Sequence, residues 1–313
     1  MTPAAHRGIG PGRAKGVPAY YDRLLVPAVE PDMDIPLRYS IVAALAQVAG
    51  SVGGGIVAVR RNPDTRSVHQ LRVAILKLRN GLRLLPRAWP AAQSSSLDRD
   101  LHWLRTQLAV SREWDLLLGD HALWQDADAV SAPRLHALAQ AEQKRAADHV
   151  AAVVRTLRCE HLEERLGKMA LPPLNSLQEA GEGMAPRRAI EKQFAAVVAR
   201  KHACGGRPED YHRLRKAVKR LGYSCQLLEG GFGDLATRYA EELGPLQHEL
   251  GKVNDATVAL GRLQELERRS GLPHGTTRRM RAHLKRRRDR HIEELQPAWK
   301  RFRHARRFWR DDD

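Results

Sequence analysis

Basic side chains recur at helical spacing in two stretches of the chain, in a pattern that suits the binding of an anion. Residues 68–85 read VHQLRVAILKLRNGLRLL, and residues 211–228, at an offset of 143 positions, read YHRLRKAVKRLGYSCQLL. At about 100° per residue on a helix, one arc of the first stretch, roughly 80° wide, is basic. It holds His69, Arg72, Arg79 and Arg83, with Lys77 just outside. The matching arc of the second stretch holds His212, Arg215 and Lys219, flanked by Lys216 and Arg220. We call these arcs the first and second basic stripes.

The chemistry that these stripes offer is the binding of an anion. Neither stripe contains an acidic residue, whereas solvated helix faces usually carry acids at i,i+4 that support the basic residues. Because unneutralised positive charges along one face repel one another, the stripes indicate an anionic ligand. Arginine suits phosphate, since its planar guanidinium donates to two oxygens at once. For His69 and His212 two roles stay open: a charged donor to the ligand, or a neutral ring that fixes the helix through a backbone hydrogen bond.

The opposite face of each stretch is apolar, so each predicts a helix that packs on one side and presents charge on the other. In the first stretch the apolar residues are Leu71, Ala74, Ile75, Leu78, Leu82 and Leu85. In the second they are Leu214, Ala217, Val218, Leu221, Cys225 and Leu228. A self-match this dense predicts that the chain contains a duplicated unit.

Two motifs carry a resemblance to a known family. H-x-L-R-V opens the first basic helix, and a later L-x-x-x-L-G-x-x-N-D comprises Leu246, Leu250, Gly251, Asn254 and Asp255. From about residue 35 to its end the chain resembles the conserved histidine α-helical domain (CHAD) family. The resemblance implies an all-α fold of two four-helix bundles related by a pseudo-two-fold axis. It also implies basic helices that line a central groove or pore, and inorganic polyphosphate as the ligand.

The chain departs from the family pattern at one position in each stripe. Seven places after the histidine, the first stretch has Leu76 and the second has Lys219. Ten places after the histidine, the first stretch has Arg79 and the second has Gly222. Each stripe therefore lacks one charge that the other keeps. The polyphosphate-binding residues that we expect are His69, Arg72, Lys77, Arg79, Arg83, His212, Arg215, Lys216, Lys219, Arg220, Arg286, Arg287 and Arg290.

The last three of these belong to a strongly basic final helix. Residues 278–310 hold fourteen Arg and Lys against three acids, so this segment carries +11 of the net charge of +17. Arg279, His283, Arg286, Arg287 and Arg290 share one arc, which by analogy with the family would extend the anion-binding surface. The alternative is a basic surface that only aids solubility. We expect the closing residues 311–313, all aspartate, to form an exposed acidic end.

Strand-like alternation is nearly absent, so the sequence predicts an all-α protein. We expect a flexible basic leader at 1–35, one four-helix half at 36–170, a Pro- and Gly-rich linker at 171–188 and a second half at 189–313. In the first half the helices are expected at 39–59, from the capping run NPDTRS to Pro86, from near Leu97, and from Pro133 to near Leu166. In the second half they are expected from Ala189 to about Ala203, from Pro208, from Asp234 to about Ser270, and after Pro273.

The first of these helices raises the possibility of a membrane span. No charge interrupts the sequence between Arg38 and Arg60, which is long enough to cross a bilayer. It is, however, mostly Ala, Gly, Ser and Gln around a few aliphatic residues. We therefore expect a buried core helix and no membrane partner, with insertion as the alternative.

Composition restricts the class of partner. A net charge of +17 and a pI near 10.4 indicate a polyanion: nucleic acid, an anionic membrane surface or polyphosphate. Aromatic residues make up only 5% of the chain, which argues against stacking of single-stranded bases. The three cysteines form no C-x-x-C pair, so neither a zinc site nor a disulfide framework is expected. No signal peptide is recognisable, and a cytoplasmic location is expected.

Catalytic motifs are missing. The sequence contains no P-loop, no H-E-x-x-H and no nucleophile elbow, and no compact acidic cluster that would hold Mg²⁺. We interpret Glu113, Asp115 and Asp255 as partners of nearby arginines or as helix caps. The sequence thus predicts a protein that binds polyphosphate, associates with polyphosphate granules, and has no catalytic residue, metal or cofactor. The alternatives are a nucleic-acid-binding protein without sequence specificity and, less favoured, a polyphosphate-processing enzyme.

Overall fold

In the computed structural model, the regular secondary structure of the described residues, 34–85, 89–169, 186–273 and 275–310, is entirely helical. The helices are α1 (Asp34–Arg61), α2 (Thr65–Leu84), α3 (Ala91–Gln107), α4 (Ala109–Leu118), α5 (His121–Gln125), α6 (Ala132–Val153), α7 (Leu157–Gly167), α9 (Pro186–His202), α10 (Pro208–Phe232), α11 (Asp234–Ser270) and α12 (Arg278–His304). The all-α prediction is confirmed. The expected leader, linker and acidic end fall almost wholly outside the described residues.

Local signals explain where the two basic helices begin. Asp64 precedes α2, and its side chain accepts a hydrogen bond of 2.7 Å from the backbone N–H of Ser67. This contact satisfies a donor that the first helical turn leaves unpaired. Helix α10 begins at Pro208. The N–H groups of the first helical turn have no acceptor within the helix, so proline, which has no N–H, is favoured at this position. Both starts agree with the sequence prediction.

Two predicted boundaries in the first half are wrong. Helix α3 starts at Ala91 rather than near Leu97, because Pro90 ends the preceding segment and the serine run continues the helix instead of breaking it. The helix expected from Pro133 to near Leu166 is two helices, α6 and α7. They separate where the backbone of Thr156 becomes extended and its hydroxyl caps the N–H of Cys159. The short helices α4 and α5 were not separately predicted.

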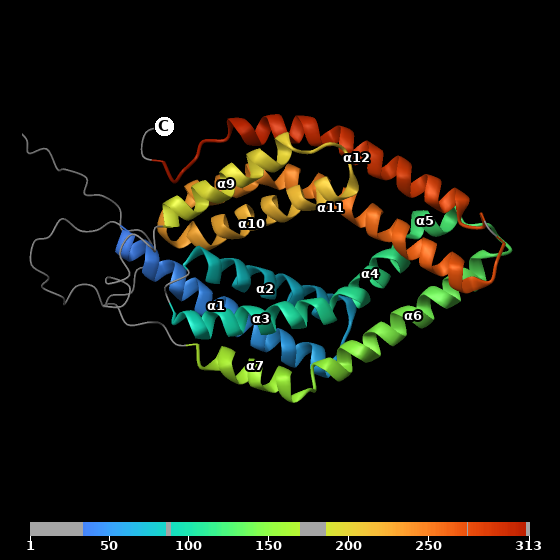
Figure 1. Cartoon of the computed structure of the whole chain (residues 1–313), viewed down its shortest axis with the longest axis horizontal. Helices are drawn as coiled ribbons and strands as arrows, with labels where there is room; N and C mark the ends of the chain where they lie inside the picture. The colour runs from blue at the N-terminus through green and yellow to red at the C-terminus, as the bar shows by residue number, and fades with distance from the viewer. Residues whose placement is uncertain (1–33, 86–88, 170–185, 274, 311–313) are drawn as a thin grey trace, which may run out of the picture. The chain divides into compact units, whose positions relative to one another are not determined.

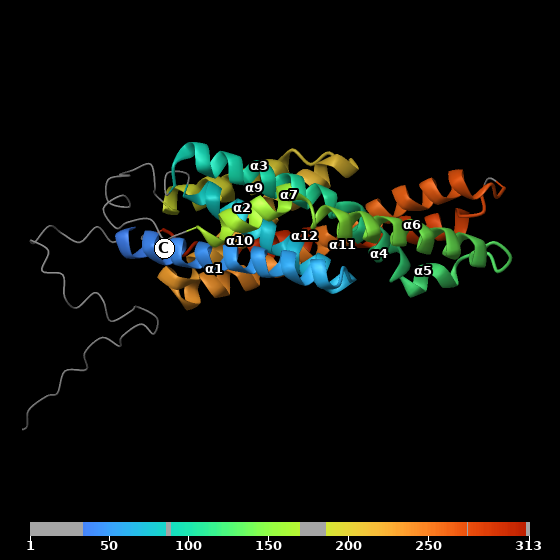
Figure 2. The ribbon, with the colours of Figure 1, turned by 90° about the horizontal axis from the view of Figure 1, so that it is seen from below.

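Helices from both ends of the sequence share one apolar core. Buried residues of α1, α2, α3, α6, α7, α9, α10, α11 and α12 form one continuous cluster, and those of α4, α5, α6, α11 and α12 form a second. Helix α1 packs against α2 and α10, and α2 lies between α1 and α3 (Figures 1 and 2). A buried polar chain also links the halves: Asn80 Nδ2 donates to Ser224 Oγ at 2.9 Å, and Ser224 Oγ donates to Gln193 Oε1 at 2.9 Å.

Helix α1 is long and apolar enough to cross a membrane, and among the described helices it is the one that meets this test. In the structure one of its faces is core: Ile41, Leu45, Val52 and Ile56 are fully buried. Glycines and other small residues lie on its exposed face, so this face is less apolar than the buried one. One face of α1 thus packs in the core and the other is exposed, and the prediction that α1 does not enter a membrane stays a prediction.

Candidate anion-binding site

Arg72 and Arg215, at equivalent positions of the two matching stretches, form the centre of the site. Arg72 projects from α2, and its Nη1 donates a hydrogen bond of 3.1 Å to the backbone carbonyl of Arg105 in α3. Burial, followed by the charge of Arg105, lowers the pKa of Arg72 to about 10, although Glu113 opposes the shift. The charge of Arg215 contributes to the same lowering. Helices distant in sequence therefore bring like charges together.

Two buried guanidinium donors in this region lack a partner. The Nε atoms of Arg105 and Arg215 are buried and have no hydrogen-bond partner within the described residues. Burial lowers the pKa of Arg215, while the charge of Asp255 raises it. An unsatisfied buried donor is costly, and more so on a charged group. Both atoms are therefore unsatisfied donors inside the positively charged region.

Lys219 adds a third strongly perturbed cation. Burial, and then the charge of Arg215, lowers the pKa of Lys219 to about 8, against an opposing effect of Asp255. Among the described residues, no carboxylate lies within ion-pair distance of Arg72, Arg215 or Lys219. The low pKa of Lys219 thus reflects burial first, and then the charges of Arg215 and Arg72, which Asp255 offsets only in part.

The two histidines flank this region and have different neighbours. His212 Nδ1 lies 3.0 Å from Asn254 Oδ1, so the ring donates to the amide oxygen. Burial lowers the pKa of His212 and of His69, and at His69 the charges of Arg112 and Lys219 lower it further. Neutral rings are therefore favoured at pH 7 before a ligand binds. For His212 the partner is a side chain rather than the backbone group considered from the sequence.

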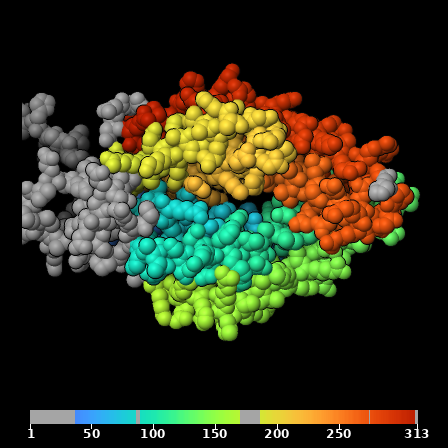
Figure 3. Space-filling view, in the orientation of Figure 1, coloured from blue at the N-terminus to red at the C-terminus, as the bar shows by residue number. Residues whose placement is uncertain are grey.

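We name these groups the central cationic cluster, which comprises His69, Arg72, Arg105, Arg112, His212, Arg215 and Lys219. Its members come from α2, α3, α4 and α10. The surface is hollowed between the segment of α9 and α10 and the segment of α2 and α3 (Figure 3). Arg105 and Arg112 were not among the residues predicted from the sequence. Their spacing of seven residues, two helical turns, was a signal that could have identified them.

Arg79, Arg83 and Arg220 form a second group, which we call the outer arginines. Arg79 donates through Nε and Nη2 to Asp98 at 2.7 and 3.1 Å, and Arg83 Nη2 donates to the same carboxylate at 3.0 Å. Asp98 of α3 thus partly neutralises the first basic stripe, which contains no acid of its own. The pKa of Arg220 is lowered by burial and then by the charges of Arg83, Arg200 and Arg79. The outer arginines, which belong to α2 and α10, therefore lie near one another.

The remaining predicted residues lie in different surroundings. Lys216 is exposed on α10, where its charge contributes to the lowered pKa of His212. Lys77 is half-buried on α2. The second stripe has Gly222 where the first has Arg79. A Cβ at Gly222 would lie 1.9 Å from Nε2 of Gln247, so a side chain at this position would require the flexible Gln247 side chain to move.

The structure does not bring the basic arc of α12 into the central cationic cluster. Arg287 pairs with Asp120, and His283 Nδ1 lies 2.6 Å from Asp126 Oδ2, so this arc packs against acids at the two ends of α5. Arg286 and Arg290 are exposed on the same helix. Their contribution to an anion-binding surface stays a prediction.

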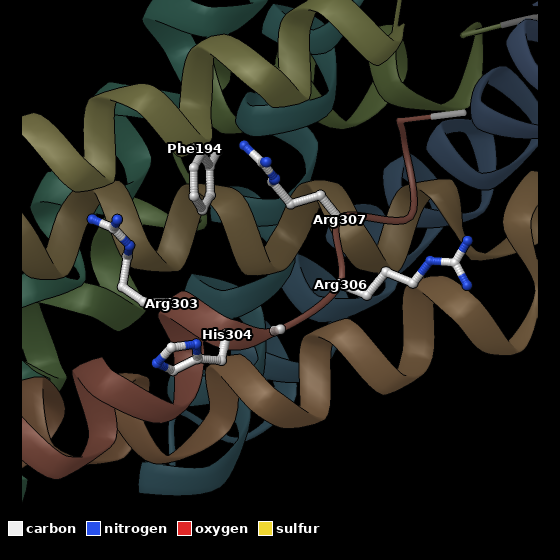
Figure 4. A pocket seen from close by; sticks show the side chains of 6 residues that line it. Phe194, Arg303, His304, Arg306 and Arg307 are labelled. Atoms are coloured by element: carbon white, nitrogen blue, oxygen red, sulfur yellow. The ribbon is translucent and has the colours of Figure 1, made fainter. Parts of the chain in front are cut away.

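A separate basic pocket of about 400 Å³ lies where α12 ends against α9, lined by Phe194, Arg303, His304, Ala305, Arg306 and Arg307 (Figure 4). The guanidinium of Arg307 lies 5.3 Å from the centre of the Phe194 ring, and that of Arg303 lies 5.7 Å from the Trp299 ring. Cations are favoured at a helix C-terminus by the helix dipole. The charge here is therefore explained by stabilisation of the end of α12.

The acids near the central cationic cluster are few and partly engaged. Glu113 Oε2 accepts hydrogen bonds of 2.6 and 3.1 Å from Arg262, as the sequence interpretation proposed for this residue. Gln143 Nε2 donates to Asp115 Oδ1 at 3.1 Å. The described part of the chain contains no group of three or more His, Cys, Asp or Glu placed to hold a metal ion.

An all-α fold that gathers arginine and lysine from distant helices into a half-buried cluster defines an anion-binding helical protein. The chain belongs to the CHAD domain family, whose model matches residues 43–264. Polyphosphate binding is a known property of this family.

Two solved structures are similar to this chain. The crystal structure of the CHAD domain from the plant Ricinus communis is 25% identical, with a TM-score of 0.70 over 86% of this chain and 92% of the other. PptA from Streptomyces chartreusis is 13% identical, with a TM-score of 0.67 over 83% of this chain and 98% of the other, a likeness of fold alone. Comparison with curated proteins gave no significant match.

Proposed function

We propose that this protein binds inorganic polyphosphate through the central cationic cluster and does not transform it chemically. One observation carries the proposal: Arg72, Arg105 and Arg215 are half-buried close to one another, and Arg105 and Arg215 each have a buried Nε without a hydrogen-bond partner. Such an arrangement is unfavourable in isolation, because it combines like-charge repulsion with desolvation. Phosphate oxygens would relieve both, since each is an acceptor that carries negative charge.

The ligand must also explain the shape of the site. Polyphosphate is a repeating anion without bases, so it requires a series of cations and no base-reading groups. The central cationic cluster and the outer arginines are linked through Arg105, whose pKa is lowered by burial and then by the charges of Arg79 and Arg83. A continuous series of cations suits a linear phosphate polymer.

The test is a binding titration with long-chain polyphosphate, followed by competition. We expect polyphosphate to displace bound DNA or RNA at equal concentration of phosphate. If it fails to do so, the proposal is wrong and the nucleic-acid alternative stands. That alternative is supported by the net charge of +17 and by the exposed arginines of α12.

Placement of the aromatic residues favours polyphosphate over single-stranded nucleic acid. Phe194, Tyr239, Phe302, Phe308 and Trp309 contact one another at the end of α12 rather than in the central cationic cluster. Stacking on aromatic rings is a large part of single-strand binding. Base stacking is therefore a poor explanation for the cationic cluster.

A polyphosphate-processing activity is the less favoured alternative. We expect no release of phosphate when the protein is incubated with polyphosphate and Mg²⁺ or Mn²⁺. Phosphate release above that of a variant carrying Glu113→Gln and Asp255→Asn would replace the binding proposal with an enzymatic one. For the cellular role we infer association with cytoplasmic polyphosphate granules. A fluorescent fusion should colocalise with stained granules and become diffuse when Arg72 and Arg215 are replaced by glutamate.

A further inference from the structure

Asp98 of α3 lies between two arginines of the first basic stripe and occupies their donors as an anionic ligand would. It accepts two hydrogen bonds from Arg79 and at least one from Arg83, with 28% of its side chain exposed. Burial alone would raise the pKa of Asp98, but the hydrogen bond and charge of Arg79, with the charge of Arg83, lower it. Asp98 is therefore ionised at neutral pH.

The central cationic cluster and the outer arginines differ in how they are neutralised. In the central cationic cluster, no carboxylate of the described residues lies within ion-pair distance of Arg72, Arg215 or Lys219. Among the outer arginines, Arg79 and Arg83 form ion pairs with Asp98. A short anion can therefore bind at the centre without breaking an ion pair, whereas an anion that extends to Arg79 and Arg83 must compete with Asp98.

We propose that Asp98 is an internal competitor that a long phosphate polymer displaces and a short one does not, so that it tunes the chain-length preference of the site. The inference rests on the proposed function and specifies its ligand further. A carboxylate and a phosphate both offer oxygen pairs that fit a guanidinium fork. Asp98 therefore keeps the outer arginines ordered without ligand, at the cost of weaker binding of long chains.

The experiment compares inorganic triphosphate with long-chain polyphosphate on the full chain. Asp98→Asn removes the charge with almost no change in shape. We expect it to raise the affinity for long-chain polyphosphate by roughly three- to five-fold, the effect of a partly exposed ion pair. Its affinity for triphosphate should change no more than that of the control.

The matched control is Asp100→Asn, two positions further along the same helix. Asp100 also pairs with two arginines, Arg158 at 2.9 Å and Arg165 at 2.6 Å, but both belong to α7. The two variants change the net charge equally. Only Asp98→Asn should alter the ratio of the two affinities.

A second variant makes the test independent of the folding of Asp98→Asn. Arg83 is 46% exposed, so Arg83→Ala should fold, and it should weaken the binding of long-chain polyphosphate while leaving triphosphate unaffected. Thermal unfolding checks each variant.

The possible outcomes are distinct. An equal gain for both ligands in Asp98→Asn would show that Asp98 acts only through net charge, and weaker binding of the long chain would show that it mainly orders the arginines. Either result overturns the inference while the proposed function stands, as does an Arg83→Ala variant that binds long chains normally. Absence of polyphosphate binding by the wild type would instead refute the proposed function itself, and the inference with it.

Discussion

Arg72 in α2 and Arg215 in α10, which occupy equivalent positions of the two matching stretches, interact electrostatically across the contact between these helices. Each helix alone would present its arginine to solvent, where repulsion is weak. Packing of α2 against α10 brings the charges together and partly removes them from water. The predictions below follow from this relationship and from the groups around it.

Reversing the charge of both residues should abolish polyphosphate binding. For Arg72→Glu with Arg215→Glu we expect a loss of affinity of roughly a hundred-fold or more at low salt, because two attractive contacts become repulsive. Helical content and thermal unfolding should be retained, since the two new carboxylates, although they repel each other, would face the cations Arg105, Arg112 and Lys219. The control, Arg286→Glu with Arg290→Glu, makes the same change on exposed positions of α12. If the control loses binding and the central variant keeps it, α12 is the binding surface.

Salt should weaken binding steeply. If about six to eight cations contact the polymer, and each contributes a slope near 0.7 as for a single-stranded polyanion, a four-fold rise in salt should reduce affinity by roughly a thousand-fold. The measurement is a series of titrations at increasing NaCl concentration. A flat dependence would contradict binding through the cationic cluster.

Lys219 should make binding and stability depend on pH in opposite directions. Its pKa is lowered to about 8 by burial and by Arg215, so above pH 8 it loses the charge that attracts phosphate, and affinity should fall. The unfolded chain keeps an ordinary lysine pKa near 10.4 and binds more protons between about pH 8 and pH 10. The contribution of Lys219 to the free energy of unfolding therefore increases with pH over this interval.

The variant Lys219→Arg separates these effects, because arginine stays charged throughout this range. The fall in affinity between pH 7 and pH 9 should be smaller in this variant, and its gain in stability should disappear. Calorimetric titrations and denaturant unfolding at several pH values provide the two measurements. An identical pH profile for wild type and variant would exclude Lys219 as the titrating group.

Asn80 should stabilise the packing of α2 against α10. It is 5% exposed and donates to Ser224 Oγ, which is itself fully buried. Asn80→Ala leaves a buried hydroxyl with one partner fewer and opens space in the core, so it should lower the free energy of unfolding by about 1–3 kcal/mol. Gln226→Ala, at an exposed position of α10, is the control and should have little effect. Denaturant unfolding measures both.

Much of the fold was predictable because the relevant signals are local. The heptad-like spacing of Leu71, Ile75 and Leu78 predicted the buried face of α2, and all three are fully buried. Proline and aspartate marked the beginnings of α2 and α10. The start of α3 was misplaced because a serine run is compatible with both a loop and a helix. Whether it becomes helical depends on the packing of the residues that follow.

The candidate site was only partly predictable, because the partners of a charge are a long-range property. Periodicity alone placed Arg72 and Arg215 opposite the apolar faces of their helices. Only the tertiary structure added Arg105 to them, paired Arg79 and Arg83 with Asp98, and placed Arg287 against Asp120. Sequence spacing determines which face of a helix a side chain shares, whereas helix packing decides which charges meet there and how far water is excluded from them.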